Sequence, residues 1–222
     1  MKIISYSLWG NNPIYCMGAI KNVELAYKIY PDWISRFYCA EDVDKKCVDD
    51  LIQMPNVEVF LMNQQGKWSN MFWRFFAADS DNTIISRDTD SRLNEREKNA
   101  VNVWLNSEHD FHIMRDHQWH NYKILGGMWG AKNGVLKGIT NKILEYSKTA
   151  SFIDDYNVDQ KFLAEHIYPL VKNNSVVHDP FFENKPFPTK RDGRQFVGQP
   201  FNADDTERDI THGDMIIRSK IL

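Results

Sequence analysis

The sequence predicts an α/β fold with a mixed, mostly parallel sheet and helices on both faces. Short apolar runs alternate with helical stretches along the first 106 residues, and this alternation is typical of a parallel sheet with crossover helices. With 42% hydrophobic residues, the 222-residue chain can bury a full core. A pair of aspartates directly follows one apolar run, and ligands of such sheets bind at the carboxyl ends of strands.

The first half of the chain is expected to alternate regularly between strands and helices. Residues 2–8 are an apolar run with the character of a buried strand, and a turn containing Gly, Asn and Pro follows it. The next stretch is helical and ends before Pro31. In chain order, the expected elements are strand 2–8, helix 14–30, strand 34–39, helix 44–54, strand 57–61, helix 69–78 and strand 83–86.

The second half has a less regular pattern. Its expected elements are helix 95–105, strand 111–114, an extended stretch 122–125 that leads into the glycine-rich 126–130, helix 135–146, helix 157–170 and strand 175–177. Helix 157–170 is expected although it contains Pro169, which has no N–H to donate. From Glu183 onward the chain is polar and contains three prolines, so we expect loops and a C-terminal extension.

The aspartate pair, Asp88 and Asp90, is the strongest chemical signal in the sequence. On an extended backbone, residues at i and i+2 point to the same side, so the two carboxylates lie close together on one side. Two carboxylates so close repel each other unless a cation lies between them, and oxygen ligands suit Mg²⁺ or Mn²⁺. Arg87 and Arg92 flank the pair and are candidates to bind phosphate groups. Alternatively, the two aspartates lie in a solvated turn without a ligand, because a pattern this short can arise by chance when 26% of the residues are charged.

Composition excludes several other classes of function. The net charge of −3 and the pI of about 6.2 argue against a general nucleic-acid-binding protein. No apolar run approaches the ~20 residues that a membrane span needs, and the N-terminus is too polar for a signal peptide. The three cysteines lack a metal-binding spacing and are expected to be buried thiols. These features predict a cytoplasmic protein without a transmembrane segment.

An ordered set of motifs resembles the GT-A-fold glycosyltransferases that use nucleotide sugars. It is most similar to the small glycosyltransferase-like proteins of capsular polysaccharide loci and large DNA viruses. The likeness covers about residues 1–180. The motifs that carry it are Ile-Ile-Ser-Tyr-Ser-Leu-Trp-Gly at 3–10, Trp-Arg-Phe-Phe-Ala at 73–77, Arg-Asp-Thr-Asp-Ser-Arg at 87–92, Glu-Arg-Glu at 95–97, His-Ile-Met-Arg-Asp-His at 112–117, Ile-Leu-Gly-Gly-Met-Trp-Gly at 124–130 and Asp-Gln at 159–160.

The resemblance implies a set of donor-binding and metal-binding residues. The end of the first strand would hold the nucleotide base and ribose, and a late histidine, His178, would complete a metal site for Mn²⁺ or Mg²⁺ with the two aspartates. The residues expected at the donor are Ser5, Tyr6, Ser7, Arg74, Arg87, Asp88, Gly126, Gly127, Trp129 and Gln160, and those expected at the metal are Asp88, Asp90 and His178. Structural alternatives stay open: a surface ion pair for Arg74, and core positions for Trp129 and His178.

The resemblance also implies two candidate catalytic carboxylates. Asp159, in the Asp-Gln pair, would lie beside the donor sugar and the acceptor, or it would serve as the general base. Alternatively, it has only a structural role at a helix N-terminus, where its negative charge interacts favourably with the helix dipole. Asp116 is the second candidate for the base, unless it forms an internal ion pair. The likeness of Asp159–Gln160 to the pair in glycogenin-like transferases favours a retaining mechanism.

The function expected from these residues is a metal-dependent, hexosyltransferase-like transfer of a sugar from a nucleoside diphosphate donor, by resemblance a UDP-sugar, to a hydroxyl of a glycan or glycoconjugate. Residues 1–222 would form one domain, with a nucleotide-binding half at about 1–106 and an acceptor half at about 107–222. Two alternatives are an aspartyl-phosphate phosphatase and a non-catalytic module that binds nucleotide sugars or glycans. The motif of such phosphatases has an apolar residue directly before the first aspartate, and this chain has Arg87 at that position.

Overall fold

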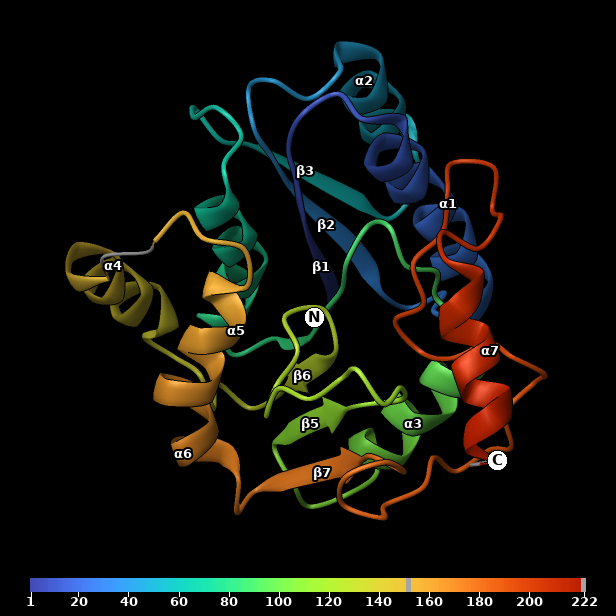
Figure 1. Cartoon of the computed structure of the whole chain (residues 1–222). Coiled ribbons are helices and arrows are strands. Elements are labelled where there is room, and N and C mark those ends of the chain that lie inside the picture. The colour runs from blue at the N-terminus through green and yellow to red at the C-terminus, as the bar shows by residue number, and fades with distance from the viewer. Residues whose placement is uncertain (151–152, 221–222) are drawn as a thin grey trace.

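A seven-stranded sheet forms the centre of the protein (Figure 1). The structure is a computed structural model and describes residues 1–150 and 153–220. The strands lie in the order β3-β2-β1-β4-β6-β5-β7, and β6 runs antiparallel to both of its neighbours. All other neighbouring strands are parallel. The strands are β1 (Lys2–Leu8), β2 (Ile34–Cys39), β3 (Val57–Leu61), β4 (Thr83–Ser86), β5 (Phe111–Met114), β6 (Trp129–Ala131) and β7 (Ser175–His178). The predicted fold class, a mixed and mostly parallel sheet, is therefore confirmed.

The helices of the first half begin where local signals predict. Asn12 caps the first of them: its Oδ1 accepts a hydrogen bond from the Ile14 N–H at 3.0 Å, and Pro13 opens the helix. Asn94 caps a later helix by accepting from the Glu97 N–H at 2.9 Å. The helices with regular α geometry in this half are α1 (Pro13–Ile29), α2 (Lys45–Gln53) and α3 (Glu95–Leu105).

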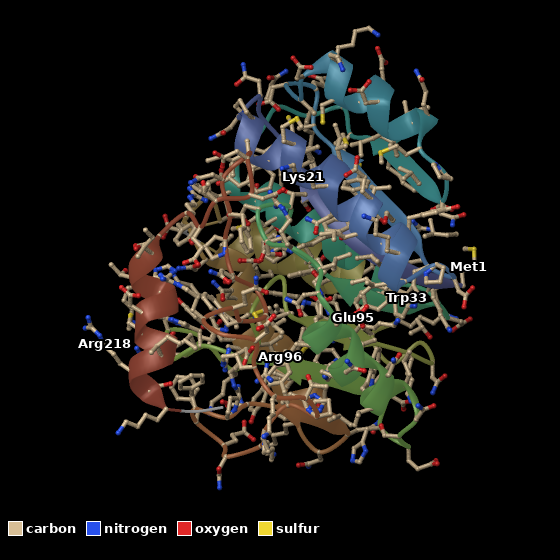
Figure 2. All side chains as sticks on the ribbon, turned by 90° about the vertical axis from the view of Figure 1, so that its right-hand side faces the viewer. Met1, Lys21, Trp33, Glu95, Arg96 and Arg218 are labelled. Atoms are coloured by element: carbon tan, nitrogen blue, oxygen red, sulfur yellow. The ribbon has the colours of Figure 1, made fainter. Side chains whose placement is uncertain are left out.

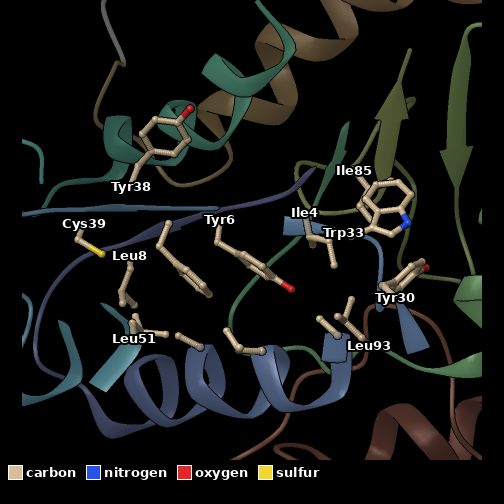
Figure 3. Packing of buried hydrophobic residues seen from close by; sticks show 14 of the residues in the cluster. Ile4, Tyr6, Leu8, Tyr30, Trp33, Tyr38, Cys39, Leu51, Ile85 and Leu93 are labelled. Atoms are coloured by element: carbon tan, nitrogen blue, oxygen red, sulfur yellow. The ribbon is translucent and has the colours of Figure 1, made fainter. Parts of the chain in front are cut away.

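The two faces of the sheet are covered by different helices, as the alternation of side chains along each strand requires. Ile4 of β1 and Ile85 of β4 belong to the core packed against α1 and α2, and part of this core is seen in Figure 3. Their neighbours Ile3 and Ile84 point to the other face, where they join residues of η1 (Trp68–Ala78), α4 (Ile139–Thr149) and α5 (Val158–Phe162). The four isoleucines have no exposed surface.

Three expected helices differ from the structure. The 69–78 segment is a 3₁₀ helix, η1, and nearly all of its side chains are buried, so tertiary packing decides its form. Helix 135–146 begins only at Ile139, because Gly138 has φ of 87°. Helix 157–170 is divided into α5, a π-helical turn η2 (Leu163–Ile167) and α6 (Tyr168–Val171), and Pro169 lies where the hydrogen-bond ladder changes.

Two elements were missed by the sequence analysis. Strand β6 begins within the glycine-rich stretch 126–130 and is only three residues long. Helix α7 (Ile210–Ser219) lies in the region expected to be loops, and Asp209 caps it by accepting from the Thr211 N–H at 2.8 Å. In Figure 2, α7 lies at the edge of the molecule with Arg218 pointing outward. Between residues 1–150 and 153–220, no helix has the length and apolar character needed to cross a membrane. The three cysteines are buried and free, as expected.

Candidate functional site

The turn that carries Asp88 and Asp90 follows β4 and is held from behind by α1. Asn22 donates its side-chain N–H groups to the Thr89 and Ser91 carbonyls, at 3.2 and 2.8 Å. Gly18 lies so close that a Cβ there would be 2.1 Å from the Thr89 carbonyl oxygen. The turn is therefore a fixed part of the fold, at the carboxyl edge where the sequence predicted it.

Arg74 joins three parts of the chain at this edge. Its guanidinium forms ion pairs with Asp88 at 2.7 Å and with Asp159 at 2.6 Å. Arg74 and Asp159 are buried, whereas 44% of the Asp88 side chain is exposed. Burial raises the pKa of Asp159, and the Arg74 charge opposes that shift. The structure thus places three predicted residues, from η1, the β4 turn and α5, in one charge network.

Gly126 and Gly127 pack directly on this network. A Cβ on Gly126 would lie 2.1 Å from Asp159 Oδ2, and a Cβ on Gly127 would lie 2.0 Å from Asp88 Oδ2. Ser86, the last residue of β4, donates its hydroxyl to the Gly126 carbonyl at 2.7 Å. The glycines are required here because the backbone approaches protein carboxylates closely; a further contact with a sugar stays a proposal.

Asp90 lies beside Asp88 but has a different partner. Its Oδ2 is 3.0 Å from a guanidinium nitrogen of Arg208, which lies 118 residues further along the chain. Burial raises the pKa of Asp90 to about 6, and the charge of Asp88 adds to the shift. The C-terminal segment therefore reaches the aspartate turn, a contact that no local pattern in the sequence predicts.

Ser7 has a supporting position, and Tyr6 lies outside the site. The Ser7 hydroxyl accepts from the Arg74 N–H at 2.9 Å and so fixes η1 to β1. Ser5 is completely buried. The expectation that Tyr6 contacts the nucleotide is not met, because its buried ring stacks on that of Phe37, with ring centroids 4.7 Å apart. Figure 3 shows Tyr6 between the sheet and α1.

Trp129 and Arg87 also belong to the interior. Trp129 is fully buried, and its ring centroid lies 5.3 Å from that of Phe75 and 5.4 Å from that of Phe111. Its ring is therefore not accessible for stacking on a sugar. Arg87 pairs with Glu97 at 2.7 Å, and both side chains are buried. Because Arg87 faces the interior, it is not available to a phosphate. These two expectations are corrected to structural roles.

Asp116 forms internal ion pairs, which the sequence analysis had named as the alternative to a general-base role. The carboxylate is completely buried and accepts hydrogen bonds from Arg96, Arg191 and the Val197 N–H, at distances of 2.7 to 3.1 Å. Both oxygens are occupied, so the expectation that Asp116 acts as a general base is not met. Arg96 belongs to α3, whereas Arg191 and Val197 belong to the stretch 191–197, so Asp116 connects α3 to that stretch.

His178 is far from the aspartate turn in the sheet. It ends β7, which is separated from β4 by β6 and β5. Its Nδ1 is 2.8 Å from Nε2 of His112, and both rings are buried. No group of three or more potential His, Cys, Asp or Glu ligands lies together among the residues that the structure describes. The expectation that His178 is the third metal ligand is therefore corrected: it pairs with another histidine.

This histidine pair should make the stability of the protein depend on pH. Burial lowers the pKa of His178 to about 4 and that of His112 well below its usual value. Both are neutral in the folded state, so their contribution to stability is complete above about pH 6.5 and is lost as the pH falls towards 4. For His178 alone, the free energy of unfolding should drop by about 2 kcal/mol between pH 7 and about pH 5, and the lowered pKa of His112 adds to this drop. Urea titrations across this range measure it.

Two single His-to-Gln variants test whether the buried histidines cause this pH dependence. His178→Gln should flatten the pH profile, because it removes one buried titrating ring. His109→Gln should leave the profile unchanged, because His109 is exposed. An unchanged profile in His178→Gln would show that other groups cause the loss of stability.

Two exposed aromatic side chains at the rim of the site were missed by the sequence analysis. Trp68 and Tyr156 are exposed and meet edge to face, with ring centroids 5.1 Å apart. The ring centroid of Trp68 also lies 6.2 Å from that of Trp9, which directly follows β1. Burial raises the pKa of Tyr156, and the charges of Asp88 and Asp90 add to this shift. We call Trp9, Trp68 and Tyr156 the aromatic rim.

Gln160 follows Asp159 and turns its side chain toward the preceding loop. Its Nε2 donates to Asn157 Oδ1 at 2.5 Å, and its backbone N–H donates to Asp159 Oδ1 at 2.9 Å. Among the residues that the structure describes, its buried Oε1 has no hydrogen-bond partner. A buried carbonyl oxygen without a donor is costly, so a ligand group is a natural candidate to satisfy it.

The fold is shared with solved glycosyltransferases. A glycosyltransferase involved in the glycosylation of the major capsid of PBCV-1 superposes with a TM-score of 0.51 and 17% identity, over 81% of each chain. The galactosyltransferase LgtC, solved with donor and acceptor sugar analogues, gives a TM-score of 0.51 and 15% identity over 81% of this chain and 74% of its own. The chain therefore has the GT-A-type fold. A scan of protein-family models finds no match, and neither does a search of curated proteins.

Proposed function

We propose that this protein is a metal-dependent glycosyltransferase that moves a sugar from a nucleoside diphosphate sugar to a hydroxyl of a glycan or glycoconjugate. The observation that carries the proposal is the Asp88–Arg74–Asp159 network at the carboxyl edge of β4. In this type of fold, that edge is where ligands bind. Residues 1–106 would supply most of the donor site, and residues 107–222 would supply Asp159 and the acceptor side.

The carboxylates of Asp88 and Asp90 fit a divalent cation. Both offer oxygen ligands, which Mg²⁺ and Mn²⁺ prefer, and burial, followed by the charge of Asp88, raises the pKa of Asp90, so a positive ion there would be favourable. Such an ion, when bound, would neutralise the charge that develops on a departing nucleoside diphosphate. Arg74 holds Asp88 in place from the buried side and so orients one carboxylate of the pair.

Asp159 and Gln160 support a retaining reaction. An inverting enzyme needs a carboxylate that is free to take the acceptor proton. Both oxygens of Asp159 are already occupied, one by Arg74 and the other by the Gln160 N–H. The side-chain amide oxygen of Gln160 is a hydrogen-bond acceptor that would stabilise positive charge developing on the donor sugar. We therefore assign Asp159 to positioning and Gln160 to the sugar.

The aromatic rim takes the place that the sequence analysis gave to Trp129. Trp68 and Tyr156 are exposed, so their rings can pack on the flat faces of a nucleobase or a sugar, and Trp9 packs against Trp68. Uracil is the base that the family resemblance implies. The rim would contribute binding energy for the donor or the acceptor, whereas the charged network would act on the diphosphate.

A binding screen tests this proposal. Thermal-shift and calorimetric titrations of UDP, GDP, CDP and dTDP, each with and without Mn²⁺, should identify one diphosphate that stabilises the protein in a metal-dependent way. A ligand at 100 times its Kd adds about 2.7 kcal/mol to the free energy of unfolding. The matching nucleotide sugar should then release its diphosphate, at least slowly, by transfer to water.

Three results would contradict the proposal. If no nucleoside diphosphate binds with either Mn²⁺ or Mg²⁺, the donor site does not exist. Turnover of p-nitrophenyl phosphate together with a stable phosphoenzyme would instead support the phosphatase alternative. Binding of a diphosphate without any release from its sugar derivative would favour a non-catalytic binding module.

A further inference from the structure

The C-terminal segment 199–209 is fixed to the aspartate turn by contacts that do not involve the carboxylates of that turn. The Phe201 N–H donates to the Asp90 carbonyl at 2.8 Å, next to a bridge between Ser91 and Pro200. Arg92 holds the segment further along, through an ion pair with Asp205 at 2.8 Å and a hydrogen bond to the Asn202 carbonyl at 3.1 Å. The segment therefore stays in place whatever the Asp90 side chain does.

Arg208 makes a different kind of contact. It places a full positive charge 3.0 Å from Asp90 Oδ2, the oxygen of a carboxylate that we assign to the metal. The Tyr15 hydroxyl is a second partner of this guanidinium. The Arg208 side chain is 41% exposed and comes from a segment anchored elsewhere, so the guanidinium can leave without unfolding anything.

The two arginines at the aspartate pair differ in whether they can be displaced. Arg74 is buried and bound to both Asp88 and Asp159, so moving it would leave Asp159 buried without its partner, at a cost of several kcal/mol. Arg208 is partly exposed, and exposed ion pairs are worth at most about 1 kcal/mol. A divalent cation that approaches the pair can therefore displace only Arg208.

We propose that Arg208 is an internal counter-ion of Asp90 that a divalent cation has to displace, so that the C-terminal segment sets the metal affinity of the site. This inference rests on the proposed function. Without metal, Arg208 neutralises Asp90 and limits its repulsion with Asp88. When the cation enters, the carboxylate exchanges one positive partner for another, and the segment keeps its backbone contacts with the turn.

The direct test measures Mn²⁺ binding to the protein without nucleotide, by calorimetry and by the loss of the free Mn²⁺ signal in electron paramagnetic resonance. Arg208→Gln removes the competing charge and should tighten Mn²⁺ binding by about two- to fivefold, the range expected from a partly exposed ion pair. Arg208→Lys should lie close to the wild type. Arg194→Gln is the matched control, since Arg194 lies in the same region but pairs with Glu207 and Asp214.

Several outcomes would overturn this inference. An unchanged or weaker Mn²⁺ affinity in Arg208→Gln would show that Arg208 does not compete with the cation. An equal gain in Arg194→Gln would show a general effect of charge. If the wild type binds a nucleoside diphosphate with Mn²⁺ while the variants do not differ, only this inference fails; if neither Mn²⁺ nor any diphosphate binds to any of them, the proposed function fails with it.

Discussion

Replacing Asp90 by asparagine is expected to reduce sugar transfer by about 10²–10³-fold while the protein stays folded. The variant loses one of two negative charges that we assign to the cation at the leaving diphosphate, and electrostatic groups of this kind carry effects of that size. The cost in stability should be below about 1 kcal/mol, because the ion pair with Arg208 is partly exposed. Release of the nucleoside diphosphate and thermal unfolding measure the two effects separately.

Asp81→Asn is the matched control for this experiment. The Asp81 side chain is 80% exposed and forms an ion pair with the surface residue Lys137, at 3.5 Å. Its replacement should change neither turnover nor stability. Wild-type turnover in Asp90→Asn would remove Asp90 from the proposed site, and loss of cooperative unfolding in that variant would show that the carboxylate has a structural role instead.

Replacing Asp116 by alanine should have the largest effect on stability, about 3–5 kcal/mol. The carboxylate is completely buried between Arg96 and Arg191, so its removal leaves two buried guanidinium groups without their anion. It also frees the Val197 N–H, which donates to it at 2.9 Å. Urea unfolding should show the loss as a lower midpoint with a similar slope.

Asp50→Ala is the control for this loss. Asp50 pairs with Lys46 at 2.6 Å on the exposed side of α2, and exposed pairs one helical turn apart contribute only about 0.3–0.5 kcal/mol. If Asp116→Ala instead unfolded like the wild type and lost only turnover, Asp116 would be a catalytic residue after all.

Most of the sheet was predictable from local patterns. Strands β1, β2, β3, β4 and β5 begin and end where the sequence predicted, because short runs of apolar and β-branched residues between turns and helices are typical of strands. The elements that differ lack such a pattern. Strand β6 has three residues and contains a glycine, and η1 is buried on nearly every side, so neither shows a clear period.

The candidate site was predictable in part, and the reason lies in sequence distance. Asp88 and Asp90 follow a strand, and the rule for the carboxyl ends of strands located them without a structure. Arg74 and Asp159 were proposed by resemblance, and the structure adds the ion pairs that join them. The assignments of Tyr6, Arg87, Trp129, Asp116 and His178 are corrected, since each side chain is buried against residues that are far away in the sequence.

The sequence by itself determined the α/β class, the order of the main strands and the position of the aspartate pair, because these depend on side-chain period and on spacing within a few residues. Only the tertiary structure decided which charges meet. Asp116 pairs with Arg96 and Arg191, and Asp90 pairs with Arg208, 118 residues away. Buried or crowded carboxylates need a positive partner, and any of the 27 lysines and arginines can supply it until the fold brings particular ones into contact.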